Sequence, residues 1–356
     1  MQRESILKSL DSEEPDVFDI AIIGGGASGL GCALDAASRG YSTVLLEGHD
    51  FASGTSSRST KLVHGGLRYL RSGEFRLVFE ALRERGLLLE NAPDFVVPLP
   101  FVIPASRFFE KLFYGAGVKL YSMLAGGRRI AKTRLLNREA CSKHLPTLPA
   151  ASNHGGVLYW DAQFDDARLA IAIAAEAARR GAVLLNYCRA RSLRKNEFGR
   201  VCGVGAEDID SGREIQINAR AVINATGPWT DEIRRQDEPG ARPMIAASRG
   251  SHIVLPDRYL PGNAALLVPE TKDGRVIFAI PWSGRVVVGT TDIPGEAALP
   301  REPKVSADEV AYLCETAEPY LGTIDPADIL STFSGIRPLV QPAEGSEHTS
   351  RMSRDH

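Results

Sequence analysis

The segment FDIAIIGGGASGLGCALDAASRGYSTVLLEGHD, residues 18–50, decides the fold of the chain. Its apolar run at 20–23 is typical of a strand that is buried in a parallel sheet. A glycine-rich turn follows, and small side chains such as Ala33 and Ala36 allow the next helix to pack closely on that sheet. Gly40 ends the helix, and TVLLE is a second strand. The segment therefore predicts a strand, a tight turn, a helix and a strand, as at the start of an α/β domain.

The glycine-rich turn fits the dinucleotide fingerprint G-x-G-x-x-G, with a strand before it and a helix after it. Glycines permit the tight turn, the approach of the backbone to a pyrophosphate, and close packing of the helix on the strand. The helix amino terminus then offers N–H groups and its positive dipole end to the phosphates. Glu47 closes the second strand, where an acid accepts hydrogen bonds from a ribose. The alternative is a turn that serves packing only. The predicted binding residues here are Gly24, Gly26, Ala27, Ser28, Gly29 and Glu47.

Only one complete fingerprint is visible, which favours FAD without a separate nicotinamide site. GVGAED, beginning at Gly203, lacks the third glycine and precedes no convincing helix. VINATGPW, residues 222–229, is a strand that runs into a glycine turn, where FAD-binding sheets commonly contact the cofactor again. Ala225, Thr226 and Gly227 are the predicted contacts. One flavin dinucleotide implies a reduced organic substrate, with electrons leaving to a quinone, to oxygen or to a carrier protein.

The remaining sequence predicts two domains built from interleaved segments. Residues 74–93 have the apolar spacing of a helix, and residues 166–187 are a second helix-to-strand unit in which Gly181 ends the helix. Residues 245–292 are short β-rich runs separated by Pro and Gly. We predict an α/β fold: a glutathione-reductase-like, Rossmann-type FAD-binding domain with an antiparallel, β-rich substrate domain. Together with the family resemblance described below, these patterns imply a flexible tail at 1–15, an FAD-binding domain at 16–100 and 151–235, a substrate-binding and membrane-facing domain at 101–150 and 236–335, and a truncated return segment to the FAD domain at 336–356.

Composition excludes several classes of protein. The 356 residues carry 42 Lys and Arg against 44 Asp and Glu, and a net charge of −2 argues against a nucleic-acid binder. No apolar run reaches the roughly 18 residues of a spanning helix. The start, MQRESILKSLDSEEPD, lacks the basic-then-apolar order of a signal peptide. Five widely spaced cysteines form neither a disulfide framework nor a paired metal motif, so we predict no metal site and a reducing cytoplasm.

A second informative stretch is SSRSTKLVHGGLRYLRSGEF, residues 56–75, which groups a histidine, two glycines and an arginine. A histidine has an ordinary pKa near neutral pH and suits the task of a base beside a flavin, so His64 is the candidate. Gly65 and Gly66 remove side chains where a flavin ring and a substrate lie near the backbone. The planar guanidinium of Arg68 is suited to a phosphate. The alternative for His64 is a core histidine bonded to a backbone carbonyl.

The order of these and further motifs resembles that in FAD-dependent, quinone-linked glycerol-3-phosphate dehydrogenases. The motifs are IIGGGASGLGCALDAASRG, TSSRSTKLVHGGLRYL, EFRLVFEALRER, VINATGPW, GSHIVL, IPW, VGTTD and SGIRPL. The resemblance covers the chain from about residue 16 onward, and glycerol-3-phosphate oxidases share most of these motifs. It implies oxidation of sn-glycerol 3-phosphate to dihydroxyacetone phosphate, with FAD as the cofactor and a membrane quinone as the electron acceptor.

The resemblance also assigns roles to single residues. It implies His64 as the base, and Arg68 and Arg337 as ligands of the substrate phosphate, since a dianion in a partly dry site needs more than one cation. A surface arginine at a strand end is the alternative for Arg337. His252 is a further catalytic candidate near the active site, although strand structure would also explain it.

Further contacts are implied on the substrate and cofactor sides. Tyr69 and Thr291 are predicted to contact the substrate, and turn structure is the alternative for Thr291. A polar loop is the alternative for the serines and the lysine among the cofactor contacts. The cofactor contacts predicted after the fingerprint are Thr55, Ser56, Ser57, Lys61, Leu62, His64, Gly65 and Gly66.

Residues 106–132, SRFFEKLFYGAGVKLYSMLAGGRRIAK, carry an apolar stripe bordered by basic residues. This pattern predicts an interfacial amphipathic helix attracted to anionic headgroups. A core contact is the alternative, and Gly115 and Gly117 each cost a helix about 1 kcal/mol. Because family dehydrogenases reduce ubiquinone or menaquinone at membranes, we expect a cytoplasmic protein, peripheral on the inner face of the cytoplasmic membrane. A homodimer is left open, and no nucleic-acid partner is expected.

The chain ends at TSRMSRDH, where family members continue with a strand, a Gly-Gly-Lys-x-Thr-Thr-Tyr-Arg motif and a C-terminal helical domain. The resemblance therefore implies either a fragment or a protein that lacks part of its cofactor pocket. Three alternatives to the quinone-linked enzyme remain: an oxidase that reduces oxygen, an amine or amino-acid oxidase of the same fold, and a truncated chain without activity.

Overall fold

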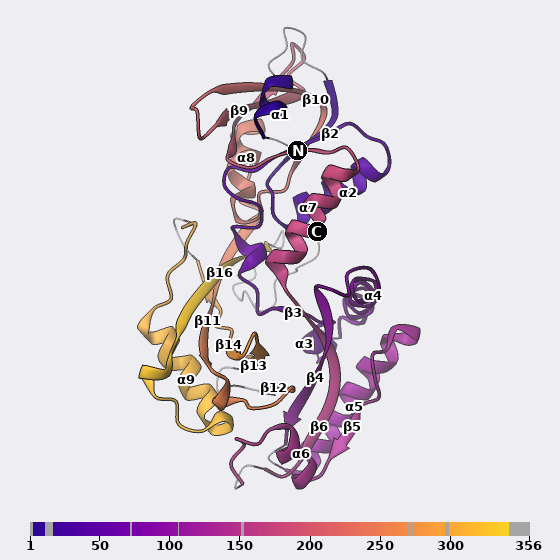
Figure 1. The fold of residues 1–356 in the computed structure, drawn as a ribbon, viewed down its shortest axis with the longest axis vertical. Coiled ribbons are helices and arrows are strands. Elements are labelled where there is room, and N and C mark those ends of the chain that lie inside the picture. Colours follow the sequence, from indigo (N-terminus) through magenta and orange to yellow (C-terminus); the bar gives the residue numbers. More distant parts are fainter. Residues whose placement is uncertain are drawn as a thin grey trace.

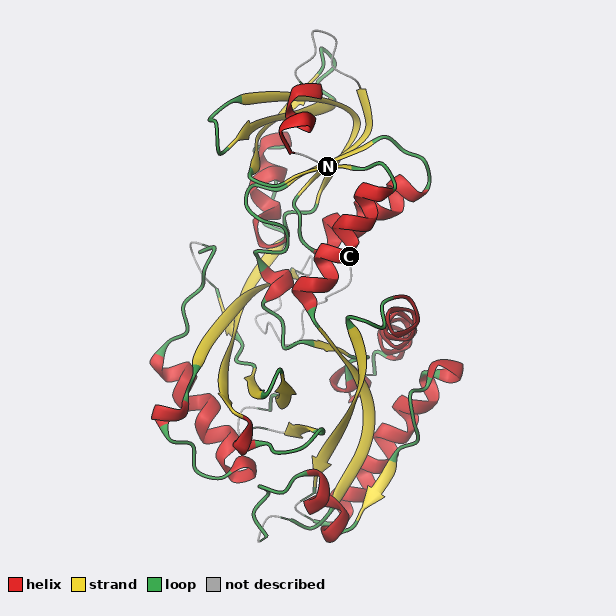
Figure 2. Ribbon diagram, viewed as in Figure 1, coloured by secondary structure: helices red, strands yellow, loops and turns green. Residues whose placement is uncertain are grey.

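The computed structural model describes residues 3–10, 17–71, 73–105, 107–150, 153–268, 271, 274–295 and 299–341. Its strands form two sheets that lie one beyond the other along the molecule (Figure 1). The sheet at the top of the view carries the predicted nucleotide-binding segment. The larger sheet below it opens into two arms with helices on their outer sides (Figure 2). This mixed α/β architecture confirms the predicted fold class.

The first sheet has the strand order β7-β2-β1-β10-β9-β8, and β7, β2, β1 and β10 run parallel. Helices α2 and α7 cover one face, while α1 and α8 contribute to the core on the other. The elements of this part are α1 (Arg3–Ser9), β1 (Val17–Ile23), α2 (Ala27–Ser38), β2 (Thr43–Leu46), η1 (Thr55–Ser57), α7 (Asp166–Arg179), β7 (Val183–Leu185), β8 (Cys188–Lys195), β9 (Val201–Asp208), β10 (Glu214–Asn224), η3 (Gly227–Trp229) and α8 (Thr230–Asp237).

The predicted strand, turn, helix and strand form β1, α2 and β2. Leu30 and Ala33 of α2 are fully buried against Ile22 and Leu45 of the sheet. Each large aliphatic side chain buried in this way stabilises the fold by about 1.5–3 kcal/mol. Gly40 follows α2 with a φ of +85°, a backbone conformation that favours glycine and ends the helix.

The second sheet has the order β15-β11-β14-β13-β12-β4-β6-β3, with β16 paired to β11 and β5 paired to β6. All of these pairs are antiparallel except β12 with β4. The short β-rich runs of residues 245–292 predict this mainly antiparallel sheet. The elements are β3 (Leu62–Val63), α3 (Leu67–Arg71), α4 (Phe75–Asn91), β4 (Val96–Pro104), α5 (Phe108–Leu124), η2 (Gly126–Arg128), β5 (Arg134–Leu136), α6 (Arg138–His144), β6 (Gly156–Phe164), β11 (Ile245–Pro256), η4 (Asp257–Tyr259), β12 (Ala265–Val268), β13 (Ile277–Trp282), β14 (Arg285–Gly289), β15 (Ile293–Pro294), α9 (Ala307–Leu321), η5 (Pro326–Asp328) and β16 (Ser331–Val340).

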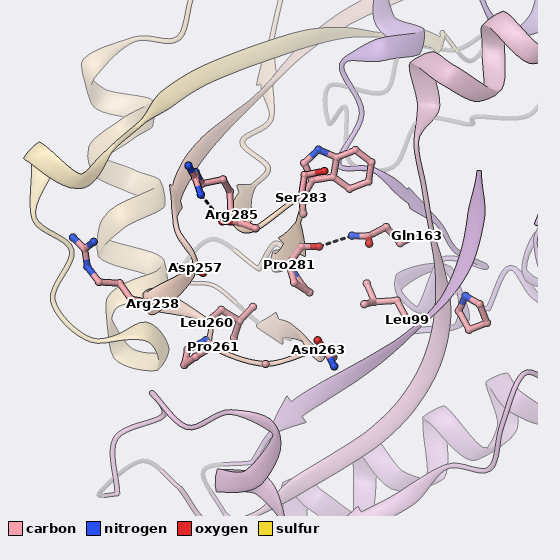
Figure 3. Close-up of a pocket in the computed structure, with 14 residues that line it drawn as sticks. Leu99, Gln163, Asp257, Arg258, Leu260, Pro261, Asn263, Pro281, Ser283 and Arg285 are labelled. Atoms are coloured by element: carbon pink, nitrogen blue, oxygen red, sulfur yellow. Dashed lines mark hydrogen bonds between the residues drawn. The ribbon is translucent and has the colours of Figure 1, made fainter. Parts of the chain in front are cut away.

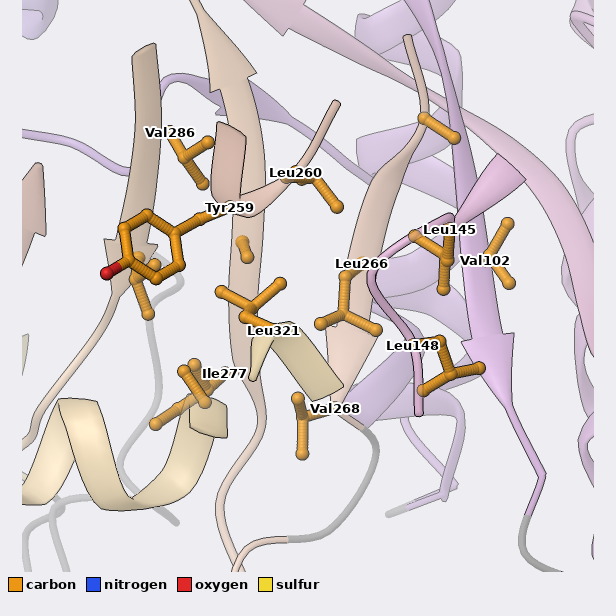
Figure 4. Close-up of a cluster of buried hydrophobic side chains, with 14 of the residues drawn as sticks. Val102, Leu145, Leu148, Tyr259, Leu260, Leu266, Val268, Ile277, Val286 and Leu321 are labelled. Carbon is orange, nitrogen blue, oxygen red and sulfur yellow. The ribbon is translucent and has the colours of Figure 1, made fainter. Parts of the chain in front are cut away.

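One hydrophobic core fills the space between the second sheet, α9 and the α6 region (Figure 4). Leu321 of α9 packs there with Leu266 of β12 and Ile277 of β13, and all three are buried. Leu145 and Leu148, just after α6, complete the cluster beside β4. This core fixes α9 against β11 and β14, the strands that carry the candidate site.

Two sequence expectations differ from the structure. Within the predicted flexible tail, residues 3–9 form helix α1, because Ile6 buries its side chain against the first sheet and Arg3 pairs with Asp208. Strands β4 and β6 were predicted largely as part of the FAD-binding domain, but they pair with each other in the second sheet over nine positions. Pairing between strands more than fifty residues apart leaves no local signal in the sequence.

Candidate active site

The amino terminus of α2 forms a cradle that requires glycine. Gly24 has a φ of +110°, and a Cβ there would overlap the carbonyl group of Ala225. A Cβ on Gly29 would overlap the carbonyl oxygen of Gly24, so α2 approaches β1 at backbone contact. No side chain caps α2 at Gly26, and its first turn contains no acid. The positive end of the helix therefore stays available to an anion such as a pyrophosphate.

Glu47 lies beside this cradle, just past the end of β2. One carboxylate oxygen accepts a hydrogen bond from the Gly25 N–H at 2.7 Å, and the other accepts one from the His49 N–H at 2.8 Å. Each oxygen keeps a second acceptor direction, so the carboxylate is oriented for ribose hydroxyls. The Ala27 N–H donates to Ser56 Oγ at 2.8 Å, which ties the following segment to the cradle. These residues fit the pyrophosphate and ribose of FAD.

The predicted second contact with the cofactor, after β10, lies at the same edge of the first sheet. The Ala225 N–H donates to the carbonyl of Ile23 at 2.8 Å, so the chain leaves β10 beside the end of β1. The Thr226 hydroxyl donates to the Asn224 side chain at 2.7 Å, and Gly227 begins η3 with a φ of +57°. The turn predicted from VINATGPW therefore adjoins the cradle.

Sequence reasoning missed a group of basic and aromatic side chains that come together near this edge. Arg189 of β8 lies 3.0 Å from Nε2 of His49, and Arg301 lies 5.3 Å from the centre of a Trp229 ring. Burial, and then the charges of Arg301 and Arg189, lower the pKa of His49 and so favour the neutral form of its ring. No spacing in the sequence could reveal this group, because its members come from separate segments.

The segment after the cradle crosses from the first sheet to the second. Thr55 donates its hydroxyl hydrogen bond to the carbonyl of Ile336 in β16 at 2.6 Å. Thr60 Oγ1 lies 2.9 Å from Nε2 of His252 in β11. Leu62 then enters β3 beside β6. The crossing segment, residues 55–64, therefore lies against the face of the second sheet that carries the remaining candidates.

Lys61 ties the crossing segment to itself and to α7. Its Nζ donates to the carbonyl of Ser57 at 2.6 Å and to both carboxylate oxygens of Asp166 at 2.7 and 2.9 Å. It also lies 5.5 Å from the ring centre of Phe333. Because the buried carboxylate of Asp166 compensates the lysine charge, Lys61 holds this segment to α7, and its predicted contact with the cofactor stays a prediction.

Four residues in adjacent strands form a row beneath the crossing segment. Phe278 of β13 pairs with Gly289 of β14. His252 of β11 pairs with Gly289 on one side and with Phe333 of β16 on the other. A Cβ on Gly289 would overlap the His252 ring, so glycine makes room for it. Phe333 stacks on that ring, with centroids 4.5 Å apart and planes at 9°. We call Phe278, Gly289, His252 and Phe333 the aromatic row.

His64 lies over one end of the aromatic row. Its ring faces Phe278, with centroids 6.0 Å apart and an interplanar angle of 29°, and it is partly exposed. A Cβ on Gly65 would overlap side chains of α4 and α5, and Gly66 has a φ of +69° against the Tyr69 ring. Because these two residues are glycines, the backbone can lie directly against α4 and α5, and the imidazole lies beside the sheet. A partly exposed imidazole in this position can accept a hydroxyl proton.

His252 was predicted as a catalytic candidate, and its side chain is buried, with 2% of its surface exposed. Burial, and then the charges of Arg337 and Lys61, lower its pKa to about 3. Thr60 contacts Nε2, while Nδ1 finds no hydrogen-bond partner within the described part of the chain. Burial therefore favours the neutral ring at physiological pH, and the predicted catalytic role of His252 stays a prediction.

Arg337 lies on β16, on the same face as Phe333 and four residues from it. Nη2 donates to Thr290 Oγ1 at 2.9 Å and to the carbonyl of Thr291 at 3.1 Å, and Nη1 lies 3.3 Å from Asp292. A Cβ on Gly250 would overlap the guanidinium, so a glycine again makes room. The side chain is about one-fifth exposed, at 21%. A planar cation oriented in this way is suited to a phosphate.

The other substrate candidates are Thr291, Tyr69 and Arg68, and the side chains of the first two are described in the structure. The Thr291 hydroxyl is buried and donates to Glu309 of α9 at 2.8 Å, so it faces α9. Tyr69 is partly buried over Gly66. The backbone of Arg68 lies in α3, but its side chain is outside the described part of the structure. Its predicted phosphate contact therefore stays a prediction.

A cavity of about 630 Å³ lies elsewhere, in the gap that the short strand β12 leaves between β13 and β4 (Figure 3). The Gln163 side chain reaches across it and donates to the carbonyl of Pro281 at 2.7 Å. Leu99, Asn263 and Arg285 are among its lining residues. None of the predicted site residues lines this cavity, so we assign the candidate site to the face of the aromatic row.

The geometry defines a class of protein. A dinucleotide cradle on one sheet is joined, through the crossing segment, to a second sheet whose glycine-rich face carries His64 and Arg337. This arrangement is that of a flavin-dependent oxidoreductase with a substrate sheet beside its cofactor domain. The chain belongs to the FAD dependent oxidoreductase family, which it matches over residues 19–354. The match confirms the predicted cofactor, FAD.

Curated relatives confirm the resemblance to glycerol-3-phosphate dehydrogenases. The chain is 42% identical over 369 residues to the mitochondrial glycerol-3-phosphate dehydrogenase of Rattus norvegicus, covering 99% of this chain and 50% of the relative. It is 41% identical to the mitochondrial enzyme of Homo sapiens with the same coverage. The chain thus spans about half the length of the curated relatives it matches.

Solved structures support the same fold. The glycerol-3-phosphate dehydrogenase of Bacillus halodurans complexed with FAD matches with a TM-score of 0.77 and 32% identity, covering 96% of this chain and 60% of that one. The L-alpha-glycerophosphate oxidase of Mycoplasma pneumoniae with FAD bound matches with a TM-score of 0.72, covering 92% and 85%. Its identity is 16%, so it bears on the fold alone.

Proposed function

We propose that the protein oxidises sn-glycerol 3-phosphate to dihydroxyacetone phosphate. The observation that carries the proposal is the common face of the second sheet, where His64 adjoins one end of the aromatic row and Arg337 lies beyond the other. A base and a phosphate ligand on one glycine-lined face suit a small phosphorylated alcohol. The identity to glycerol-3-phosphate dehydrogenases supports the same substrate.

The mechanism assigns a task to each residue. The amino terminus of α2 binds the pyrophosphate of FAD, and Glu47 binds a ribose. Arg337 holds the substrate phosphate, with Arg68 as its proposed second ligand. His64 accepts the hydroxyl proton at a ring nitrogen. FAD, when bound, supplies the acceptor for the hydride that leaves the carbinol carbon. Buried, neutral His252 keeps the sheet face rigid under the substrate.

We propose a membrane quinone, ubiquinone or menaquinone, as the electron acceptor, at the inner face of the cytoplasmic membrane. Helix α5 supports this assignment, because Phe109, Phe113 and Met123 expose 82%, 67% and 64% of their surfaces. The neighbouring Lys119 is exposed as well, and Lys111 is partly exposed. Such a surface suits an anionic membrane interface. No helix within the described ranges is long and apolar enough to cross a membrane.

An absorption experiment tests the reaction. Under anaerobic conditions, glycerol 3-phosphate should bleach the visible absorption of the FAD-loaded chain, because substrate oxidation reduces the flavin. Glycerol without the phosphate should bleach it far more slowly, since Arg337 then has no anion to bind. A yellow protein that keeps its colour with glycerol 3-phosphate would refute the proposed activity. Steady-state rates with quinone analogues and with oxygen alone would then separate a dehydrogenase from an oxidase.

A further inference from the structure

We propose that Tyr121 of α5 is a positioning residue that sets the backbone of the turn at residues 64–66. This inference rests on the proposed function, which makes His64 of that turn the base. The Gly65 N–H donates a hydrogen bond of 2.6 Å to the Tyr121 hydroxyl. Tyr121 contacts the peptide next to the base and acts on the reaction only through it.

The Tyr121 hydroxyl is itself held by a buried ion pair. It donates to Asp161 Oδ2 at 2.7 Å, while Arg85 Nη1 donates to Asp161 Oδ1 at 2.7 Å. The three side chains come from α5, β6 and α4, and each exposes about 1–2% of its surface. The path from Arg85 through Asp161 and Tyr121 to Gly65 is a continuous chain of hydrogen bonds. We call these three side chains the buried relay.

The buried relay is a costly way to fill a core. Burying an ion pair gains little stability over well-packed apolar side chains, because both charges lose their hydration. Arg85 also leaves its Nε without a hydrogen-bond partner within the described ranges. A role in packing alone would not need these charges. The relay does, however, fix the direction in which the Tyr121 hydroxyl presents its acceptor lone pair to Gly65.

The protonation states suit this role. Burial, and then the nearby Asp161, raise the pKa of Tyr121 well above that of a free tyrosine, so its hydroxyl keeps the proton that it donates. Burial raises the pKa of Asp161 to about 6, and Arg85 opposes that rise. At neutral pH the carboxylate therefore accepts from both neighbours, and the hydroxyl oxygen faces the peptide N–H.

The hydrogen bond from the Gly65 N–H ties the turn to a polar group of the protein core. Neither Gly65 nor Gly66 has a side chain that could pack, and glycine is the most flexible residue along the backbone. The peptide N–H of Gly65 therefore gives the Tyr121 hydroxyl a point at which it can fix the direction of the turn backbone. An error of about 1 Å in the position of a reacting group can cost about 100-fold in rate. Loss of this hydrogen bond should therefore affect the chemical step more than substrate binding.

Tyr121→Phe tests the proposal, because it removes one oxygen and keeps the ring. Tyr159→Phe is a matched control: Tyr159 is equally buried, packs edge-on to Tyr121 at 6.2 Å, and has no hydrogen bond to Gly65 among the described residues. With FAD loaded, Tyr121→Phe should lower kcat by about 10- to 100-fold, with KM and FAD affinity changed less than about twofold. Tyr159→Phe should leave kcat within about twofold. A comparable loss in both variants would overturn the proposal.

Amide hydrogen exchange gives a readout that does not depend on activity. The Gly65 amide should be protected in the wild-type chain, and Tyr121→Phe should accelerate its exchange at least about tenfold, because the hydroxyl that accepts its 2.6 Å hydrogen bond is gone. An unprotected Gly65 amide in the wild type would overturn the proposal even if the variant failed to fold. Absence of bleaching by glycerol 3-phosphate in the wild type would refute the proposed function, and exchange would still decide whether Tyr121 holds the turn.

Discussion

Nε2 of His252 lies 2.9 Å from the hydroxyl of Thr60, and this contact joins the segment that leaves the nucleotide cradle to the substrate sheet. The two residues are 192 positions apart in the chain. Thr60 belongs to the crossing segment, and His252 is the centre of the aromatic row. The contact therefore couples the position of His64, four residues after Thr60, to the strands that carry Arg337.

Replacement of Thr60 by valine should loosen this coupling. Thr60→Val keeps the shape of the side chain but leaves a buried ring nitrogen of His252 without a partner, which costs about 1–3 kcal/mol. Urea unfolding should show a matching decrease in the free energy of unfolding. Thr60→Ser keeps the hydroxyl and should recover most of the loss. Equal stability of the valine variant and the wild type would contradict the role of this contact.

His252 and Asp161 should have opposite effects on how the free energy of unfolding depends on pH. The pKa of His252 is lowered to about 3, so the unfolded chain binds the extra proton between about pH 3 and 6.5 and stability rises with pH there. The pKa of Asp161 is raised to about 6, so the folded chain binds the extra proton between about pH 4 and 6 and stability falls with pH there. The two slopes, each up to about 1.4 kcal/mol per pH unit, largely cancel between pH 4 and 6.

His252→Phe should reveal this cancellation. The variant removes the rising contribution, so its free energy of unfolding should fall more steeply, or rise less, between pH 4 and 6 than that of the wild type. Urea midpoints at several pH values measure the difference. Parallel pH profiles for the variant and the wild type would show that His252 is not held neutral in the folded chain.

The cradle should not tolerate a methyl group at Gly29. A Cβ there would overlap the Gly24 carbonyl oxygen, so Gly29→Ala should move α2 away from β1 and abolish FAD retention. Gly31→Ala is the control, because a Cβ on this helical residue meets no atom within 4 Å. Alanine there should add up to about 1 kcal/mol of helix stability. The absorption spectra of the purified variants give the result, and a yellow Gly29→Ala protein would refute this account of the turn.

Arg337 should contribute to substrate binding more than to cofactor binding. Arg337→Lys keeps the charge but loses the planar fork, and we expect KM for glycerol 3-phosphate to rise at least about tenfold, which corresponds to about 1.4 kcal/mol. FAD content should stay unchanged. Arg285→Lys, at an exposed arginine of the separate cavity, serves as the control. If both variants kept the wild-type KM, Arg337 would not be a ligand of the phosphate.

The exposed face of α5 should bind anionic vesicles. The double substitution Phe109→Glu with Phe113→Glu should decrease cosedimentation with vesicles containing phosphatidylglycerol several-fold, because it removes apolar contact and adds negative charge. Phe198→Glu is the control, since Phe198 is 79% exposed on the turn between β8 and β9 of the first sheet. Equal losses in both proteins would indicate a charge effect without a specific docking face.

The sequence predicted the cofactor side of the site better than the substrate side. Gly24, Gly29 and Glu47 lie within one short segment, and their spacing is that of a dinucleotide-binding motif. Residues distant in the chain were harder to interpret. The sequence did not indicate the ion-pair partner of Lys61, because Asp166 lies 105 positions away along the chain. Nothing near Tyr121 in the sequence indicates that its hydroxyl reaches Gly65.

By itself, therefore, the sequence determined what neighbouring residues build together: the glycine cradle, the amino terminus of α2 and the antiparallel character of residues 245–292. Backbone conformation and helix dipoles depend on residues that are neighbours in the sequence, so a sequence motif is enough to predict them. Tertiary structure alone decided the neutral state of His252, the buried relay behind Gly65 and the membership of β4 and β6 in the second sheet. These properties depend on burial and on contacts between distant segments, which exist only after the chain has folded.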